Sequence, residues 1–264
     1  MKVMNEANSE KAIRFLKQRE EHRRRLEEEW PRYKEQQPEC SRRLTSELRA
    51  LKRRFSPWIG GCYCDSGLRI KVLVVGDSTY LGPLPAPVFE REYDDDGTDW
   101  FNKNAIFPYR NEYWGDAYFT KWTNALVGES VEHRDRRQFR RGVLDSVAFY
   151  NFCDSILERA GVCPEPDAFV KARPIFGQIL ETLKPHLVIL TAYRVRDVLS
   201  NRAPYGGAWE TYDGGYSLIR PPKGPSLLCL PHPNGGRRWW KKNQVHAAVL
   251  DSITLLGGNL YRAG

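Results

Sequence analysis

One segment of the sequence combines a histidine with turn residues, cations and large rings. It reads LLCLPHPNGGRRWW, residues 227–240, and the pair KK follows it. An imidazole can act as a general acid, a general base or a hydrogen-bond donor. Glycines let a backbone approach a ligand closely, cations bind phosphates, and indole rings stack on bases. The segment therefore predicts contact with nucleic acid, through Gly235, Arg237, Arg238, Trp239, Trp240 and Lys241.

Polar side chains capable of chemistry also follow other apolar runs. Asp77 and Ser78 come directly after IKVLVVG, Asn151 lies in SVAFYNF, and His232 follows SLLCLP. Because the carboxyl ends of parallel strands meet at one edge of a sheet, we expect Asp77, Asn151 and His232 to lie close together. An acid, an amide and an imidazole at one edge are typical of a functional site.

The elements that would position these residues are four short apolar runs bounded by turn residues. They are IKVLVVG (70–76), SVAFYNF (146–152), HLVILTA (186–192) and SLLCLPHP (226–233). Helical segments precede the third run and follow the fourth, namely DAFVKARPIFGQILETLK and NQVHAAVLDSITLL. This alternation predicts an α/β fold, a three-layer α/β/α sandwich around a central, mainly parallel sheet of four strands.

The N-terminal part of the chain has a different composition, rich in Glu, Arg, Lys and Leu. This mixture predicts helices over about 6–54, interrupted at Pro31 and Pro38. We therefore expect a basic helical extension over 1–56 and a second domain over 57–264. The extension has three possible roles that the sequence leaves open: contact with DNA, oligomerisation and contact with a protein partner.

Charge and hydropathy narrow the class of protein. The 264 residues carry a net charge of +8, and 41% of them are hydrophobic. Most of the excess charge lies in the first 57 residues, and a basic surface favours a phosphate-bearing partner. No apolar run approaches the ~20 residues of a membrane span, and the N-terminus lacks the apolar stretch of a signal peptide. We expect a cytoplasmic protein with DNA as its partner and no membrane.

Six cysteines are spread along the chain. No pair has the CxxC spacing, and Cys62 and Cys64 are too close together for the usual zinc site. We therefore expect free thiols, no metal and no cofactor, with an iron–sulfur cluster disfavoured for the same reason.

Four motifs, in this order, resemble those of the uracil-DNA glycosylase superfamily. They are VVGDSTY with Asp77, PVF with Phe89, FYNF with Asn151 and HPNGG with His232. The resemblance covers about residues 57–264. Thr79 stands where most relatives have Pro, and Asn234 where they have Ser.

The resemblance implies a monofunctional DNA glycosylase, which flips a pyrimidine out of DNA and hydrolyses its N-glycosidic bond to leave an abasic site. Asp77 would then act at the sugar, and Ser78 occupies the alternative register, where classical members carry their Asp. His232 would stabilise the departing base. The expected base-binding residues are Asn151, Phe89 and Tyr80. No lysine is expected at this edge, so no lyase step through a Schiff base is predicted.

The identity of the base stays open between uracil and a modified cytosine. The altered motifs, an insertion over 94–124 and a ring-rich loop over 203–217 leave room for a larger base. Some members of the superfamily remove modified cytosines from viral DNA in bacterial defence, and the chain is similar to such proteins.

Other functions and purely structural roles remain alternatives. The chain could be a catalytically inactive nucleic-acid-binding module on the same fold, or an unrelated α/β enzyme that binds a small nucleotide. Asp77 is also suited to cap a helix, Asn151 to tie two loops together, and His232 to hold a turn. Large rings such as Phe89 and Trp240 are most often buried.

Overall fold

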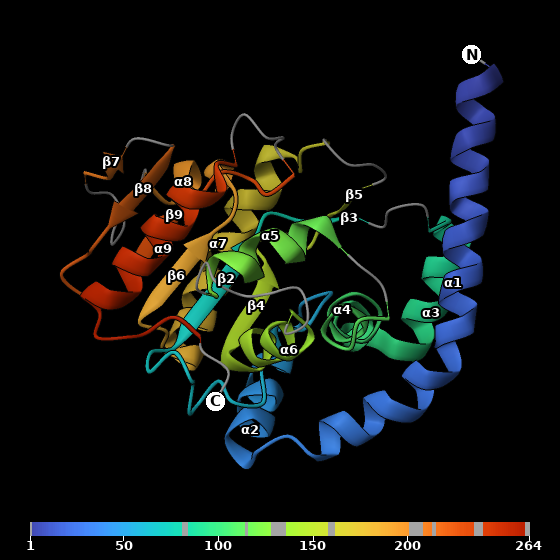
Figure 1. Ribbon diagram of the computed structural model, residues 1–264, viewed down its shortest axis with the longest axis horizontal. Helices are drawn as coiled ribbons and strands as arrows, with labels where there is room; N and C mark the ends of the chain where they lie inside the picture. Colours follow the sequence, from blue (N-terminus) through green and yellow to red (C-terminus); the bar gives the residue numbers. More distant parts are fainter. Residues whose placement is uncertain are drawn as a thin grey trace.

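A computed structural model of the chain describes residues 2–80, 84–113, 116–127, 136–157, 162–200, 208–212, 215–234 and 240–261. The fold is of the α/β class, as predicted, with a central seven-stranded sheet (Figure 1). No helix among these residues is both long and apolar enough to span a bilayer.

The four predicted strands lie next to one another at the centre of this sheet. They are β4 (Val147–Asn151), β2 (Val72–Gly76), β6 (Leu187–Leu190) and β9 (Ser226–Cys229), in that order and parallel. Their side chains are almost completely buried on both faces, which explains the continuous apolar runs.

The expected four-stranded sheet is nevertheless wrong, because the sheet is mixed and has three more strands. These are β1 (Trp58–Ile59) beside β4, and β8 (Tyr216–Ile219) and β7 (Glu210–Tyr212) beyond β9, all antiparallel to their neighbours. They are two to four residues long, and β7 is exposed along its whole length. Strands of this kind lack the apolar run that would identify them in a sequence.

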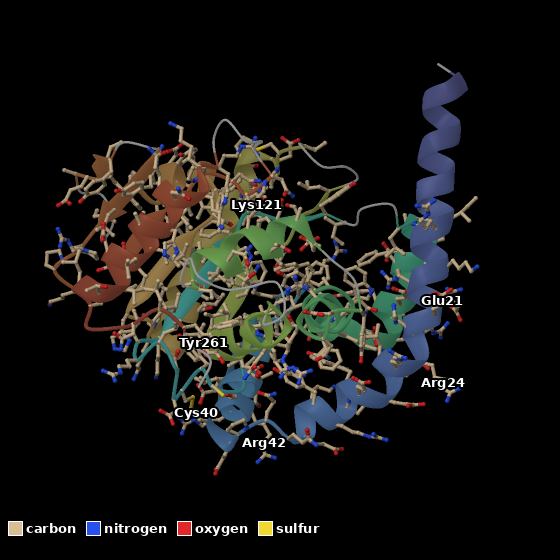
Figure 2. All side chains as sticks on the ribbon, in the orientation of Figure 1. Glu21, Arg24, Cys40, Arg42, Lys121 and Tyr261 are labelled. Atoms are coloured by element: carbon tan, nitrogen blue, oxygen red, sulfur yellow. A yellow bond between two sulfur atoms is a disulfide. The ribbon has the colours of Figure 1, made fainter. Side chains whose placement is uncertain are left out.

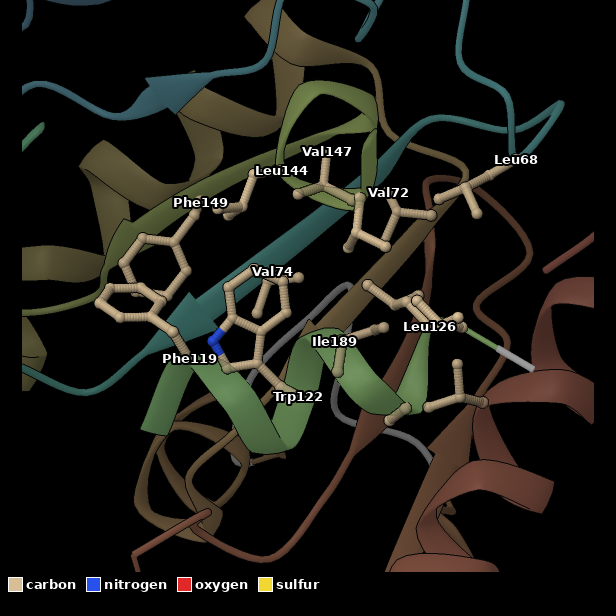
Figure 3. Close-up of a cluster of buried hydrophobic side chains, with 14 of the residues drawn as sticks. Leu68, Val72, Val74, Phe119, Trp122, Leu126, Leu144, Val147, Phe149 and Ile189 are labelled. Atoms are coloured by element: carbon tan, nitrogen blue, oxygen red, sulfur yellow. The ribbon is translucent and has the colours of Figure 1, made fainter. Parts of the chain in front are cut away.

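Helices cover both faces of the sheet. One face carries α5 (Ala117–Ala125), α6 (Arg136–Ser146) and α9 (Lys242–Leu255), and the other α2 (Glu39–Arg49), α7 (Pro166–Leu183) and α8 (Tyr193–Ser200). Alternate residues of a strand face opposite ways, so Val72 and Val74 pack beneath α5 while Leu73 and Val75 pack towards α7. Figure 3 shows the first of these clusters, with Trp122 of α5 against the sheet.

The N-terminal helices share these two hydrophobic cores. Helix α1 (Lys2–Glu35) contributes Leu26 and Trp30 to one cluster, and α2 contributes Leu44 and Leu48 to the other. The predicted boundary at 56 therefore does not separate two independent cores. Helix α1 also continues through Pro31, where the sequence predicted an interruption, and it bends in its C-terminal third (Figure 1). A proline inside a helix removes one main-chain hydrogen bond and can bend a helix without ending it.

The predicted insertion over 94–124 is mostly helical and lies between α1 and the sheet. It is built from α3 (Ala86–Asp96), a 3₁₀ turn (Gly97–Asp99), a π-helical turn (Asn102–Ile106), α4 (Phe107–Arg110) and α5. Arg19 of α1 pairs with Glu92 of α3 at 2.5 Å, which holds the two helices side by side (Figure 1). A small parallel sheet, β3 (Thr79–Tyr80) and β5 (Ile156–Leu157), extends the ends of β2 and β4.

The expectation of six free thiols is wrong for two of the cysteines. Cys40 at the start of α2 forms a disulfide with Cys64, with the two Cα atoms 6.5 Å apart (Figure 2). The two cysteines are separated by 24 positions in the sequence, and the fold brings their thiols together in a way that their spacing does not reveal. Cys62, Cys153, Cys163 and Cys229 are free.

Candidate active site

The three polar residues that follow the central strands lie at one edge of the sheet. Gly76 of β2 is in register with Asn151 of β4, and Leu190 of β6 is in register with Cys229 of β9. Asp77 and His232 therefore emerge at this same edge, and the Asp77 carboxylate is near enough to influence the titration of His232. The geometry that the sequence predicts for the strand ends is present.

The imidazole of His232 is held in one orientation and favours its neutral form. Its Nδ1 accepts a hydrogen bond from the main-chain N–H of Asn234 at 3.1 Å, so the neutral ring carries its proton on Nε2. Burial lowers the pKa of His232, and the nearby cations Arg194 and Lys121 act in the same direction, whereas Asp77 opposes them. Near neutral pH the ring therefore presents an uncharged Nε2–H donor.

Asp77 is a largely buried carboxylate with two polar neighbours. Ser78 Oγ donates to Asp77 Oδ1 at 3.1 Å, and Arg194 Nη1 lies 3.6 Å from Asp77 Oδ2. The Asp77 side chain is only 13% exposed. Ser78 thus holds one oxygen of the Asp77 carboxylate by a hydrogen bond, and which of the two positions is the catalytic one stays a prediction.

Asn151 is fixed from both its side chain and its main chain. Its Nδ2 donates to Thr79 Oγ1 at 2.9 Å, and its carbonyl oxygen accepts from Arg53 Nη2 at 2.6 Å. A Cβ atom on Gly76 would lie 2.3 Å from Asn151 Oδ1, so only glycine leaves room for this amide. The side chain thus links the end of β4 to the segment that follows β2, much as the structural alternative proposed. Among the described residues no donor is bonded to its Oδ1, which could accept a hydrogen bond from a ligand.

Tyr118 of α5 belongs to the site and was missed by the sequence analysis. Its ring centroid lies 5.6 Å from that of His232, and its Oη lies 2.7 Å from Thr191 Oγ1. Helix α5 is placed by Asp116, which caps its N-terminus, and by Trp122, which stacks on Phe149 of β4 at 5.9 Å (Figure 3). The Asp-Ala-Tyr-Phe capping pattern was the available signal.

A lysine also lies at this edge, contrary to expectation. Lys121, one turn further along α5, donates to the carbonyl oxygen of Pro233, directly after His232 (Figure 2). The fold brings it there from more than a hundred residues away in sequence, so no local motif indicates it.

Phe89 does not serve as the predicted base-stacking ring. It is 1% exposed within α3 and packs with Phe55, Leu84 and Trp100 in a separate hydrophobic cluster. The Trp100 ring meets it edge-on at 4.8 Å. A ring enclosed in this way has no free face for a base, and the spacing of PVF in the sequence could not reveal its burial.

Tyr80, the other aromatic residue predicted to contact the base, lies on β3 and is 48% exposed. The tyrosine whose ring lies against His232 is Tyr118. Contact between Tyr80 and a base stays a prediction.

Of the residues predicted to bind DNA, the structure describes Trp240 and Lys241. Gly235, Arg237, Arg238 and Trp239 lie outside the described residues. Trp240 is 8% exposed and belongs to the core beneath α9, so it does not fill the space left by a flipped base. Lys241 is exposed immediately before α9 and stays a predicted phosphate contact.

In the part of the chain that the structure describes, no three His, Cys, Asp or Glu side chains are grouped to hold a metal ion. The Asp77 carboxylate and the His232 imidazole are groups that can perform acid–base and hydrogen-bond chemistry. No protein-family model matches the sequence, and no curated protein is significantly similar to it.

Proposed function

We propose that the chain is a monofunctional DNA glycosylase of the uracil-DNA glycosylase type, acting on uracil or a modified cytosine. The observation that supports the proposal is that the Asp77 carboxylate and an uncharged His232 N–H donor follow parallel strands at the same end of the sheet. Such a pair matches the charges that develop when an N-glycosidic bond breaks.

In the proposed reaction, the bond between C1′ of the sugar and the base breaks, and its electron pair leaves with the base. Asp77 stabilises the positive charge at C1′ and orients a water, whose oxygen bonds to C1′ and whose proton is lost to the carboxylate. His232 Nε2–H donates to the carbonyl oxygen that gains negative charge. One such donor contributes on the order of 3 kcal/mol to lowering the barrier.

The substrate must first be flipped from the duplex, at a cost of a few kcal/mol. We expect Arg194, whose side chain is about half exposed, and the exposed Lys241 to bind phosphates of the DNA. Contacts of this kind make binding strongly salt-dependent. A cytoplasmic enzyme with this activity would suit base excision or defence against viral DNA.

The test is a panel of DNAs that carry uracil, a thymine mismatch or a modified cytosine. The wild-type protein should produce abasic sites, detected by alkaline strand cleavage, in at least one member. Asp77→Asn should abolish release and retain DNA binding. The proposal fails if the wild-type protein releases no base from any member.

A catalytically inactive nucleic-acid-binding module is the second candidate. The 3.6 Å contact between Arg194 and Asp77 favours it, because a paired carboxylate is less available to a water. Salt-sensitive DNA binding without release from any DNA in the panel would support this candidate.

The monofunctional assignment has its own test, because Lys121 lies close to His232. Its amine is engaged with the Pro233 carbonyl. Incubation with DNA that contains a preformed abasic site, followed by borohydride reduction, should give no covalent adduct that depends on Lys121. An adduct lost in Lys121→Gln would instead show a lyase step.

A further inference from the structure

Two side-chain oxygen atoms converge on the space above Gly76. The position of a Cβ on this residue would lie 2.3 Å from Asn151 Oδ1 and 2.8 Å from Tyr118 Oη. These two distances limit the separation of the oxygens to about 5 Å. Gly76, Asn151 and Tyr118 are thus grouped beside His232, whose ring packs against Tyr118.

The amide of Asn151 directs its acceptor towards this space. Its Nδ2 donates to Thr79 Oγ1 at 2.9 Å, and Thr79 is 1% exposed, so the partner is buried and fixed. The amide group is planar, and its oxygen therefore faces away from Thr79, above Gly76. Among the described residues no donor is bonded to Oδ1, and an amide oxygen can only accept.

The hydroxyl of Tyr118 also presents a lone pair, because its proton is already used. The carbonyl oxygen of Val75 lies 3.0 Å from Thr191 Oγ1 and can only accept, so Thr191 donates its single proton there. Thr191 Oγ1 can then only accept from Tyr118 Oη, 2.7 Å away. Burial raises the pKa of Tyr118, so this phenol keeps its proton.

We infer that these two acceptors select a base with an exocyclic amino group, so that the substrate is a cytosine-type and not a uracil-type pyrimidine. The inference rests on the proposed glycosylase function. An amino group directs two protons about 120° apart, so two hydrogen bonds of about 2.9 Å can reach oxygens up to about 5 Å apart, which is the upper limit on the separation of these two acceptors. A carbonyl oxygen at the same position would face two acceptors with no proton between them.

The proposed contact with His232 does not discriminate between cytosine-type and uracil-type bases. Cytosine and uracil share the carbonyl oxygen at position 2, to which His232 would donate. We therefore expect the discrimination to arise at position 4, where hydrogen bonds of this kind favour the correct base over the wrong one by about 10- to 100-fold.

The experiment compares duplexes in pairs that differ at position 4, and in the N3 proton that accompanies a carbonyl there: cytosine and uracil, 5-methylcytosine and thymine, and 5-hydroxymethylcytosine and 5-hydroxymethyluracil. Single-turnover release should be about 10- to 100-fold faster for the amino member of each pair that is cleaved. Equal release, or faster release of the carbonyl member, would overturn the inference and leave the glycosylase proposal intact.

Variants test the hydrogen-bond directions that carry the argument. Thr79→Val removes the oxygen that orients Asn151, and Thr191→Val frees the Tyr118 proton, so each should reduce the amino-to-carbonyl ratio by about tenfold or more. Thr254→Val makes the same chemical change at an exposed position of α9 and should leave the ratio unchanged. An unchanged ratio in both site variants would count against the inference.

A binding measurement covers the case in which no base is released. Asp77→Asn is titrated with the same duplexes, and tighter binding of the amino members would support recognition of the amino group. Equal binding, together with no release by the wild-type protein, would refute both the inference and the glycosylase proposal.

Discussion

The main-chain N–H of Asn234 donates a hydrogen bond to Nδ1 of His232, 3.1 Å away. A donor at Nδ1 places the proton of the neutral ring on Nε2, the nitrogen left to contact a ligand. The residues of the turn after β9 thus determine which imidazole nitrogen is the donor.

We expect His232→Phe to lower base release by about 10²- to 10³-fold, because the ring stays and its donor is lost. DNA binding should change little. His186→Phe is the matched control, since Nδ1 of His186 accepts from the Lys71 N–H at 2.9 Å in the same way, but just before β6, at the opposite end of the strand from the site. Single-turnover rates and binding isotherms check both variants. Equal losses in the two would show that the effect is structural.

The Asn151 amide lies so close to Gly76 that a larger residue at position 76 should disturb the site. Gly76→Ala places a Cβ 2.3 Å from Asn151 Oδ1 and should displace the amide, with base release reduced at least about tenfold and unfolding free energy by about 1–3 kcal/mol. Gly177→Ala in α7 is the control. Apart from the adjacent residues and the backbone of its own helix, no described atom lies within 4 Å of its Cβ position, so the change should stabilise the helix by about 0.5–1 kcal/mol. Urea unfolding and release rates measure both, and full activity of Gly76→Ala would contradict this view of the site.

The four central strands, and the end of the sheet that carries the site, could be predicted because each buried strand leaves a continuous apolar run and ends in a turn. The outer strands of the sheet could not be predicted; β7, for example, is short and exposed and carries no such run. The positions of Asp77, Asn151 and His232 follow from parallel strands alone, since their carboxyl ends share one edge.

The side chains that complete the site come from elements that sequence patterns do not place. Tyr118 and Lys121 lie on α5, whose packing across the sheet depends on Trp122 and Phe149, distant in sequence. Phe89 and Trp240 were assigned by residue type and spacing, and neither property reveals that a ring is enclosed by neighbours.

The charges around His232 predict how its titration changes in variants. Lys121 lowers the pKa of His232 and Asp77 raises it, so Lys121→Gln should raise this pKa and Asp77→Asn should lower it further. Lys121→Arg keeps the charge and serves as the control. NMR titration of the imidazole resonances from pH 4 to pH 8 measures all three, with no need for enzymatic activity. An unchanged pKa in Lys121→Gln would contradict the placement of the cation.

The same lowered pKa has a consequence for stability. A folded-state pKa below the unfolded value of 6.5 means that the unfolded chain binds the proton more readily. The stabilising contribution of neutral His232 is therefore complete above about pH 6.5 and is lost as the pH falls through the folded-state pKa. Urea unfolding between pH 7 and pH 5 should show a smaller loss of stability in Lys121→Gln than in the wild-type protein.

The disulfide between Cys40 and Cys64 links α2 to the turn after β1. Closing a loop with a sequence separation of 24 stabilises a fold by about 3 kcal/mol in the chain-entropy description. Cys40→Ser should lower the melting temperature, and dithiothreitol should have little further effect on this variant. Cys62→Ser, at an exposed free thiol two residues from the bridge, should melt as the wild type does.

Arg53 connects the N-terminal segment to the site through its hydrogen bond to the main chain of Asn151. Its side chain is 3% exposed. The guanidinium donates to the Asn151 carbonyl at 2.6 Å and to Asp154 Oδ1 at 2.7 Å, and it lies 4.8 Å from the centre of the Tyr150 ring. Arg53→Met leaves a carboxylate and a carbonyl unpaired, so it should cost about 3 kcal/mol of stability. It should also lower base release more than binding, because the Asn151 loop loses its anchor.

Arg43→Met is the matched control for this change. Arg43 pairs with Glu47 one turn away on α2, and its side chain is 69% exposed. The loss should stay below about 0.5 kcal/mol, because an exposed ion pair contributes little. Arg53→Lys keeps the charge but not the planar guanidinium whose Nη2 reaches both acceptors, and it should fall between wild type and Arg53→Met in urea unfolding. If Arg53→Met were as stable and active as Arg43→Met, the N-terminal segment would have no part in holding the site.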